Sequence, residues 1–363
     1  MKKLLSVILS LSLITCLFSG CNDNSQNSNE LSSTNKPVVS DEDFTPNSET
    51  DFVYKEENGE IKITGYKGSS TVVNIPSQIE GKPVTAIGEY AFDGYEAPGE
   101  EEEKAGKTYT QNNINSIVSL HIPSSIKTLE EGAFTNCYSL TEVTVSEGLE
   151  TIQDGAFACC DAIKSISIPD TVKTMGGYVF YECYGMESVL LGKSIESIGD
   201  YAFYMCKSLI TLELPDSLSS IGTGCFALCE FLSEVKIPSA LTDIREYSFF
   251  NNSSLKKVSL PEGITSIGEA AFTSCTSLKE VSLPESLKTI DKGAFFSCTS
   301  LNEVTVPSGT SELKEHAFGY KHKEGEDTAE DEVEPIPSFK MIVSAGSAAE
   351  TYAKDNKIEY KTK

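Results

Sequence analysis

The sequence predicts a mainly β solenoid of about ten coils, each 23 residues long. One residue type marks the period, since nine phenylalanines recur at intervals of 23 residues: Phe134, Phe157, Phe180, Phe203, Phe226, Phe249, Phe272, Phe295 and Phe318. In each coil a triplet such as Val143-Thr144-Val145 alternates apolar and polar residues, which is typical of a half-buried strand. A proline follows most triplets and ends the strand, because it has no N–H to donate to a ladder. Since one coil leaves its apolar edges uncovered, the coils must stack around one continuous core.

A tenth phenylalanine, Phe92, fits the series if an insertion separates it from Phe134. The two residues lie 42 positions apart, which is one period plus 19 residues. The extra residues, near 94–112, are acidic, and a second acidic loop at 319–338 follows Phe318. Both loops leave the solenoid at the same place in the coil, and we expect their acidic runs to be solvated. Neither loop has the spaced oxygen ligands that Ca²⁺ needs.

Residues 1–20 have the pattern of a signal peptide. Lys2 and Lys3 precede an apolar stretch from Leu4 to Phe18, and Ser19-Gly20 provide the small residues of a cleavage site. The pentapeptide at residues 17–21, LFSGC, resembles the lipobox of bacterial lipoproteins. That resemblance implies that Cys21 becomes the mature N-terminus and carries a diacylglyceryl anchor. The alternative is plain secretion with Cys21 as an ordinary thiol.

Residues 21–50 are rich in Asn, Ser, Asp and Glu and hold few large apolar side chains. Such a segment buries too little surface to offset its ordering entropy, so it is predicted to be a disordered, lipid-anchored linker. No second apolar run of membrane length follows, which places the remainder outside the cytoplasm. The chain has 54 acidic and 29 basic residues, with a formal net charge of −25. This charge argues against nucleic acid and anionic lipid as partners.

The repeat, SLxEVxIPxxLxxIGxxAFxxC, resembles the BspA-like subclass of bacterial leucine-rich repeats over residues 84–318. The segment that begins FVYKEENGEIKITGY at Phe52 resembles the N-terminal cap of these proteins, here 51–83. AGSAAETYAKDNKIEY resembles their C-terminal cap, here 339–363 with a short helix at 348–356. The resemblance implies surface exposure and binding or adhesion, without catalysis. Proteins of this type are associated with attachment to host matrix or to other cells.

A cysteine stands three positions after most of the repeated phenylalanines, which raises the possibility of a redox, metal or disulfide site. In leucine-rich repeats this turn position carries an inward Cys or Asn that packs against the neighbouring coil. Asparagine replaces the cysteine in one coil here, a change that a buried structural ladder permits and a metal site does not. The predicted ladder is Cys137, Cys160, Cys183, Cys206, Cys229, Asn252, Cys275 and Cys298. We expect mostly reduced thiols, because the Cβ atoms of adjacent coils lie about 4.8 Å apart and disulfides need about 3.5–4.5 Å.

Signals of catalysis are weak. The three histidines, His121, His316 and His322, lie in different coils or loops, and no HExxH, GxSxG, P-loop or CxxC motif is present. His121 occupies an outward strand position, where we expect a solvated surface histidine. A Ser-His-Asp cluster assembled across coils has no feature in its favour. The sequence therefore predicts no enzyme, no cofactor and no metal site.

Two surfaces are candidates for binding. The first is a tyrosine patch at the phenylalanine turns, where GYVFYECYG stacks on DYAFYMC and places tyrosine on tyrosine. Its members are Tyr178, Tyr181, Tyr184, Tyr201 and Tyr204. These residues either stabilise the turn row or bind a protein or glycan with their amphipathic rings. The second candidate is the outward strand face, with Glu142, Thr144, Ser165, Ser167, Thr211, Glu213, Glu234 and Lys236. It lacks an aromatic anchor.

The sequence thus predicts an extracellular, lipid-anchored surface protein that binds a protein or glycan on host or neighbouring cells. Adhesion through protein–protein contacts is the leading hypothesis. Contact with a membrane is expected through the lipid anchor only. Two alternatives stay open: a scaffold or spacer of the envelope without a specific ligand, and the carbohydrate-recognising part of an enzyme system.

Overall fold

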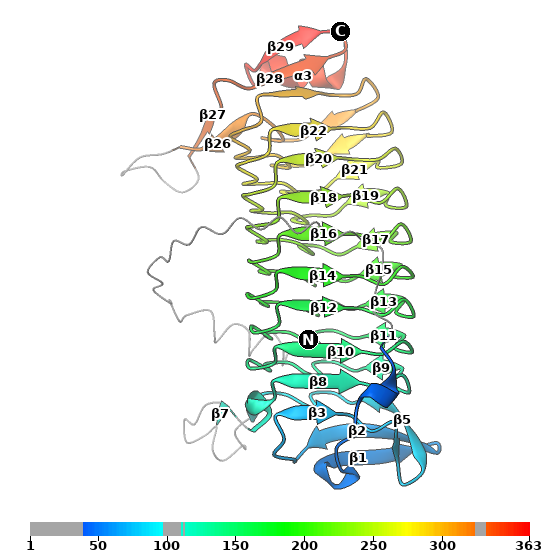
Figure 1. Cartoon of the computed structure of the whole chain (residues 1–363). Helices are drawn as coiled ribbons and strands as arrows, with labels where there is room; N and C mark the ends of the chain where they lie inside the picture. Colours follow the sequence, from blue (N-terminus) through cyan, green and yellow to red (C-terminus); the bar gives the residue numbers. More distant parts are fainter. Residues whose placement is uncertain (1–38, 97–109, 112, 324–331) are drawn as a thin grey trace, which may run out of the picture. The chain divides into compact units, whose positions relative to one another are not determined.

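The computed structural model describes residues 39–96, 110–111, 113–323 and 332–363. The predicted signal peptide, the lipidation site at Cys21 and the centres of both acidic loops lie outside these residues. Residues 39–363 form one unit by their internal contacts. Its coils stack in chain order, each contributing strands to parallel sheets (Figure 1). The predicted mainly β repeat solenoid is confirmed.

Most outward strands pair in parallel with a neighbour, and between repeat coils the partners are 23 residues apart, such as Glu142 with Ser119 and Thr211 with Glu234. They are short because the proline that follows most of them cannot donate to the ladder. In chain order they are β3 (Val72–Asn74), β8 (Ser119–Ile122), β10 (Glu142–Val145), β12 (Ser165–Ser167), β14 (Ser188–Leu190), β16 (Thr211–Glu213), β18 (Glu234–Lys236), β20 (Lys257–Ser259), β22 (Glu280–Ser282) and β24 (Glu303–Thr305). We call their outer surface the strand face.

A second row of two-residue strands crosses the other side of each coil. It comprises β9 (Thr128–Leu129), β11 (Thr151–Ile152), β13 (Thr174–Met175), β15 (Ser197–Ile198), β17 (Ser220–Ile221), β19 (Asp243–Ile244), β21 (Ser266–Ile267), β23 (Thr289–Ile290) and β25 (Glu312–Leu313). The second residue of each strand occupies the position of the isoleucine in the IG pair, as Ile198 and Ile221 do, and its side chain points into the core. The phenylalanine turn then connects the second row to the next outward strand (Figure 1).

Both ends of the stack are closed by non-repeated elements. At the N-terminal end, β1 (Phe52–Glu57) pairs antiparallel with β2 (Glu60–Tyr66), and β2 pairs with β5 (Lys82–Ile87), which β4 (Gln78–Ile79) also joins. At the C-terminal end, β28 (Lys340–Val343), helix α3 (Ala348–Asp355) and β29 (Glu359–Thr362) cover the last coil. These elements shield the edge strands that would otherwise pair with other chains.

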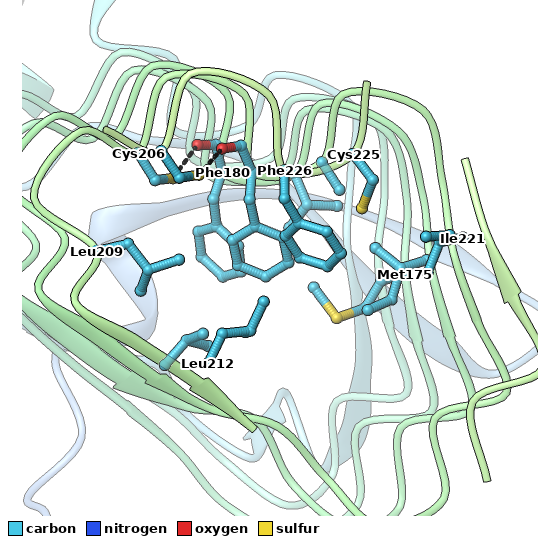
Figure 2. Packing of buried hydrophobic residues seen from close by; sticks show 14 of the residues in the cluster. Met175, Phe180, Cys206, Leu209, Leu212, Ile221, Cys225 and Phe226 are labelled. Atoms are coloured by element: carbon cyan, nitrogen blue, oxygen red, sulfur yellow. Dashed lines mark hydrogen bonds between the residues drawn. The ribbon is translucent and has the colours of Figure 1, made fainter. Parts of the chain in front are cut away.

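A stack of phenylalanine rings forms the centre of the core. The ten rings from Phe92 to Phe318 are at most 1 % exposed, and neighbouring ring centroids lie 4.7–5.7 Å apart. Tyr66 extends the stack at one end and Phe339 at the other. Figure 2 shows aliphatic side chains of both strand rows, such as Leu212 and Ile221, enclosing the rings. The period of 23 residues is thus the period of this aromatic column.

The predicted cysteine ladder runs beside the rings and joins the coils by hydrogen bonds. The thiol of Cys183 donates to the carbonyl oxygen of Phe157 in the preceding coil at 3.2 Å, and that of Cys206 donates to Phe180 at the same distance (Figure 2). The seven cysteines of the ladder all make this bond. The nine cysteines within the described residues are free thiols, and burial raises the pKa of Cys229 and Cys275 to about 12. Such thiols are protonated at neutral pH, so they act as small donors within the core.

Asn252 occupies the ladder position but fills it imperfectly. Its Oδ1 accepts from the backbone N–H of Cys229 at 3.0 Å, whereas its Nδ2 is buried and has no hydrogen-bond partner. A buried donor without a partner costs about 1–3 kcal/mol. The amide is therefore tolerated at this position, and the thiol fits it better.

The residues before β1 correct one prediction. Residues 39–50, assigned from sequence to a disordered linker, include two short 3₁₀ helices, η1 (Asp41–Asp43) and η2 (Glu49–Asp51). Asn47 exchanges hydrogen bonds with Asn74 of β3, and Asp41 binds Ser124 after β8. The prediction fails here because these contacts join residues that are far apart in the sequence.

We expect Asn252→Cys to raise the free energy of unfolding by about 1 kcal/mol, because it replaces an unpaired buried amide with a thiol that can reach the Phe226 carbonyl. Chemical denaturation of the reduced protein measures the change. The matched reverse variant, Cys275→Asn, should lower stability by a similar amount. A destabilising Asn252→Cys would show that the thiol bonds do not govern the ladder.

Candidate functional site

The phenylalanine turn has an unusual backbone that sets the position of the tyrosines. The residues two places before and two places after each phenylalanine of the middle coils adopt positive φ, as Tyr178 (56°) and Glu182 (57°) do on either side of Phe180. This conformation lets alternate N–H groups donate to the next coil, from Tyr178 to Asp200 and from Phe180 to Ala202. The turns therefore form a third hydrogen-bonded row, and their side chains recur in register.

Tyrosine at the first positive-φ position covers the turn of the following coil. A Cβ atom built on Gly224 would overlap the ring of Tyr201, which shows that this ring lies over the glycine backbone. Tyr90 covers Gly132 in the same way. These rings stabilise the turn row, and they also form its outer surface.

Four of the predicted tyrosines form a two-by-two cluster. Tyr178 stacks on Tyr201 at 5.5 Å between ring centroids, and Tyr181 stacks on Tyr204 at 5.1 Å with an interplanar angle of 10°. Within one coil, Tyr201 and Tyr204 meet nearly edge to face at 78°. The rings are half-buried, and burial raises the pKa of the Tyr181 hydroxyl, with the Glu182 carboxylate adding to the effect. The cluster is a rigid aromatic corner.

The fifth predicted residue, Tyr184, stands beside this corner and is 38 % exposed. Its hydroxyl lies 3.9 Å from the sulfur of Met205, so the side chain bridges two coils. The structure thus brings all five predicted tyrosines onto adjacent turns. It does not by itself assign them a ligand.

Sequence reasoning missed two apolar side chains on the neighbouring coils. Phe231 is 62 % exposed and Ile210 is 50 % exposed. Phe231 stands where Ser208 and Ser254 occupy the adjacent coils, and Ile210 stands where the adjacent coils carry Glu187 and Ser233. A register-by-register comparison of the coils would have detected both. We refer to Tyr178, Tyr181, Tyr184, Tyr201, Tyr204, Ile210 and Phe231 together as the aromatic turn surface.

A buried carboxylate lies within the same row of turns. Asp161 occupies the register position between Tyr138 and Tyr184 of the adjacent coils. Burial, together with the nearby negative charge of Glu182, raises the pKa of Asp161 to about 7. Its Oδ1 is buried and has no hydrogen-bond partner. An unpaired buried carboxylate oxygen is costly to the stability of the fold.

The second predicted surface, the strand face, has a different character. Six of its eight candidate residues are exposed, and only Thr144 and Ser167 are half-buried. Charges on it partly pair with one another, as Lys257 does with Glu280 at 2.9 Å. Its exposed apolar exceptions are Leu190, at 38 %, and Val72 of β3, at 45 %. The strand face is therefore a wet, mixed-charge surface.

His121 was expected to be solvated, and this prediction is wrong. The ring is 3 % exposed because Phe44 stacks on it at 3.7 Å between centroids. Its Nε2 lies 3.3 Å from Asp41 Oδ1 and 3.1 Å from Ser146 Oγ. The contact with Phe44 was not predictable because residues 39–50 were expected to be disordered.

The resulting Asp-His-Ser cluster does not have the geometry of a nucleophile relay. A relay needs the carboxylate at one imidazole nitrogen and the hydroxyl at the other. Here both contact Nε2, and the Ser146 hydroxyl donates to Asp41 at 2.6 Å. The cluster fastens the N-terminal segment to β8 and β10. Within the part of the chain that the structure describes, His, Cys, Asp and Glu form no group that could hold a metal ion.

Comparison with known proteins places this geometry in context. The family model described as BspA type leucine rich repeat region matches six copies over residues 106–230 and 196–324, which is more than half of the chain. A leucine rich repeat protein of T. pallidum is 26 % identical with a TM-score of 0.47, over 64 % of this chain and 91 % of that one. A leucine rich cell surface protein of Faecalibacterium prausnitzii is 18 % identical with a TM-score of 0.44, over 88 % of this chain and 94 % of that one. A leucine-rich repeat protein from Bacteroides ovatus is 21 % identical, also with a TM-score of 0.44, over 88 % of this chain and 100 % of that one. A search of the curated proteins finds no match.

No helix among the described residues has the length and apolarity to cross a membrane. The single α-helix there, α3, is eight residues long and belongs to the C-terminal cap.

We expect docking of residues 39–50 to weaken as the pH falls from 7.5 to 5. Burial lowers the pKa of His121, so the undocked state, with a pKa of about 6.5, takes up the proton first. Burial alone would raise the pKa of Asp41, but hydrogen bonds from Ser124 and Ser146 outweigh it and lower the pKa, so this carboxylate stays charged in the range. Hydrogen exchange of the amides of Phe44 and Asn47, corrected for intrinsic rates, measures docking. His121→Gln should abolish the pH dependence, and equal protection at both pH values in the wild type would refute the mechanism.

Asp161→Asn should stabilise the protein at pH 8 and have little effect near pH 4. The folded-state pKa is raised, so the native carboxylate costs stability increasingly as the pH rises from 3.8 through about 7. After allowance for solvent screening, we expect a gain of about 1–2 kcal/mol at pH 8. Denaturant unfolding at the two pH values measures it. A gain that is independent of pH would mean that the charge of Asp161 is not the cause.

Proposed function

The chain belongs to the family of BspA type leucine rich repeat proteins, and from this premise we propose that it is a cell-surface protein that binds other proteins through its aromatic turn surface. The signal-peptide pattern and the lipobox-like LFSGC support export and anchoring through Cys21. Adhesion to host matrix or to neighbouring cells is the activity that we propose for it.

The observation that carries the proposal is the exposed aromatic corner. Rings that are already stacked lose little conformational freedom on binding, so their contact area contributes to affinity at low entropic cost. Tyrosine is enriched among residues that dominate interface energies. The cluster of Tyr178, Tyr181, Tyr201 and Tyr204 is also rigid, because each ring touches two others or a neighbouring turn.

Exposed apolar side chains beside the corner extend the same surface. Phe231 and Ile210 are the most exposed large hydrophobic residues described in the structure. Ile210 follows the turn that holds Tyr201 and Tyr204, and Phe231 follows the turn of the next coil. Apolar side chains exposed together on one side of a soluble protein are typical of interaction sites. The strand face offers no comparable anchor.

The proposal predicts that the purified protein is retained by a member of a panel of immobilised matrix proteins and glycans, and that Tyr181→Ala/Tyr204→Ala weakens retention at least about tenfold. The adjacent coils carry Ala158 and Ala227 at this register position, so the fold should tolerate both changes. Surface plasmon resonance measures retention, and circular dichroism checks the fold.

The matched control is Glu213→Gln/Glu234→Gln on the strand face, which should leave retention unchanged. Loss of retention in this control alone would assign binding to the strand face. Retention that neither double variant changes would overturn the proposal. If no member of the panel retained the protein, the proposal would also fail, and a scaffold of the envelope without a specific ligand would be favoured.

A further inference from the structure

The aromatic turn surface carries negative charge that the protein does not neutralise. The three turn segments 153–161, 176–184 and 199–207 contain Asp154, Asp161, Glu182 and Asp200, and their single basic residue, Lys207, pairs instead with Glu230 at 3.2 Å. None of these four carboxylates forms an ion pair with another residue that the structure describes. On more distant coils, by contrast, carboxylates pair across adjacent coils, as Glu280 does with Lys257 and Glu315 with Lys292.

Within this group, Glu182 directly follows Tyr181 in the chain, and Asp161 stands in register with Tyr184 on the preceding coil. The charge of Glu182 raises the pKa of both the Tyr181 and Tyr184 hydroxyls, after the larger effect of their burial. Asp161 also adds to the shift at Tyr184, and its Oδ1 has no hydrogen-bond partner. The two carboxylates thus lie on adjacent turns beside Tyr181 and Tyr184, and their negative charges repel each other.

We propose, building on the function proposed above, that the aromatic turn surface binds a protein segment bearing arginine or lysine, whose cation lies against the tyrosine rings beside Asp161 and Glu182. A cation on the face of a tyrosine ring is attracted by the ring quadrupole, most strongly where water is excluded. Opposite charge relieves the repulsion between the two carboxylates.

The apolar neighbours specify the rest of the partner. The aliphatic stem of an arginine or lysine packs well on exposed rings such as Tyr184. Phe231 and Ile210 would contact apolar residues that flank the basic side chains. A purely apolar partner would bury Asp161 and Glu182 without neutralising them, which is costly. An anionic glycan would be repelled by all four carboxylates.

The test uses fluorescently labelled oligo-arginine as the probe, with a length-matched oligo-glutamate peptide as the negative control. Fluorescence anisotropy with the purified protein should show saturable binding of the arginine peptide only. Asp161→Asn/Glu182→Gln should weaken it by about tenfold or more. Glu213→Gln/Glu234→Gln removes the same charge from the strand face and should change affinity by less than about twofold.

Two further variants separate ring from hydroxyl. Tyr181→Phe/Tyr204→Phe keeps the aromatic faces and should retain binding, whereas Tyr181→Ala/Tyr204→Ala should lose it. If Asp161→Asn/Glu182→Gln and Glu213→Gln/Glu234→Gln weakened binding of the arginine peptide equally, the attraction would be a general electrostatic one and the inference would be overturned. Failure of the arginine peptide to bind the wild-type protein would overturn it as well.

The two proposals fail differently. Suppose that binding of a partner from the panel is lost in Tyr181→Ala/Tyr204→Ala but unchanged in Asp161→Asn/Glu182→Gln. The proposed binding function would then stand, and the proposal that the partner presents a basic side chain would be refuted. Loss of that partner with both pairs supports the inference.

Discussion

The spacing between coils is the constraint on which the rest of this structure depends. It is fixed by the column of phenylalanine rings together with the thiol that joins each coil to the carbonyl of the previous phenylalanine. A buried phenylalanine ring fills its place in the core and cannot shift without opening a cavity. A protonated thiol is small enough to lie beside the ring and still donate a hydrogen bond to the carbonyl of the preceding coil. Because every turn is held at this spacing, any residue placed on the turn recurs beside its counterpart. Stacked tyrosines, paired charges and adjacent outward side chains are all consequences of that one repeat.

Most of the fold could be predicted because its determinants are local and repeated. The interval between Phe134 and Phe157 defines the coil, and the triplet after each turn defines the outward strand. The ladder position was readable because Asn252 interrupts a run of cysteines without interrupting the period. The docking of residues 39–50 could not be predicted in this way. It depends on Phe44 meeting His121 and on Asp41 meeting Ser146, which are single contacts between segments with different composition.

The candidate site was predicted in part for the same reason. The tyrosines of adjacent coils were identifiable from their register, and the structure places them in contact. The unpaired state of Asp161 was not identifiable, because it depends on burial and on which cations are absent from the neighbouring coils. Phe231 and Ile210 were detectable in principle, since each departs from the residue type that its register position usually holds. In a repeat protein, departures from the consensus indicate function more clearly than the consensus does.

The two ribbons at the ends of the turn row show where this architecture accepts extra chain. β6 (Tyr95–Glu96) and β7 (Thr110–Gln111) leave just after Phe92, and β26 (Tyr320–His322) and β27 (Val333–Pro335) leave just after Phe318 (Figure 1). In both cases the chain departs once the ring is seated and returns before the next strand of the solenoid, so the aromatic column continues undisturbed. The turn edge is therefore a grafting position: loops of new sequence can be added there without altering the number or pitch of the coils. The length of the solenoid can therefore change by duplication of coils, while its binding properties can change separately through loops inserted at the turn edge.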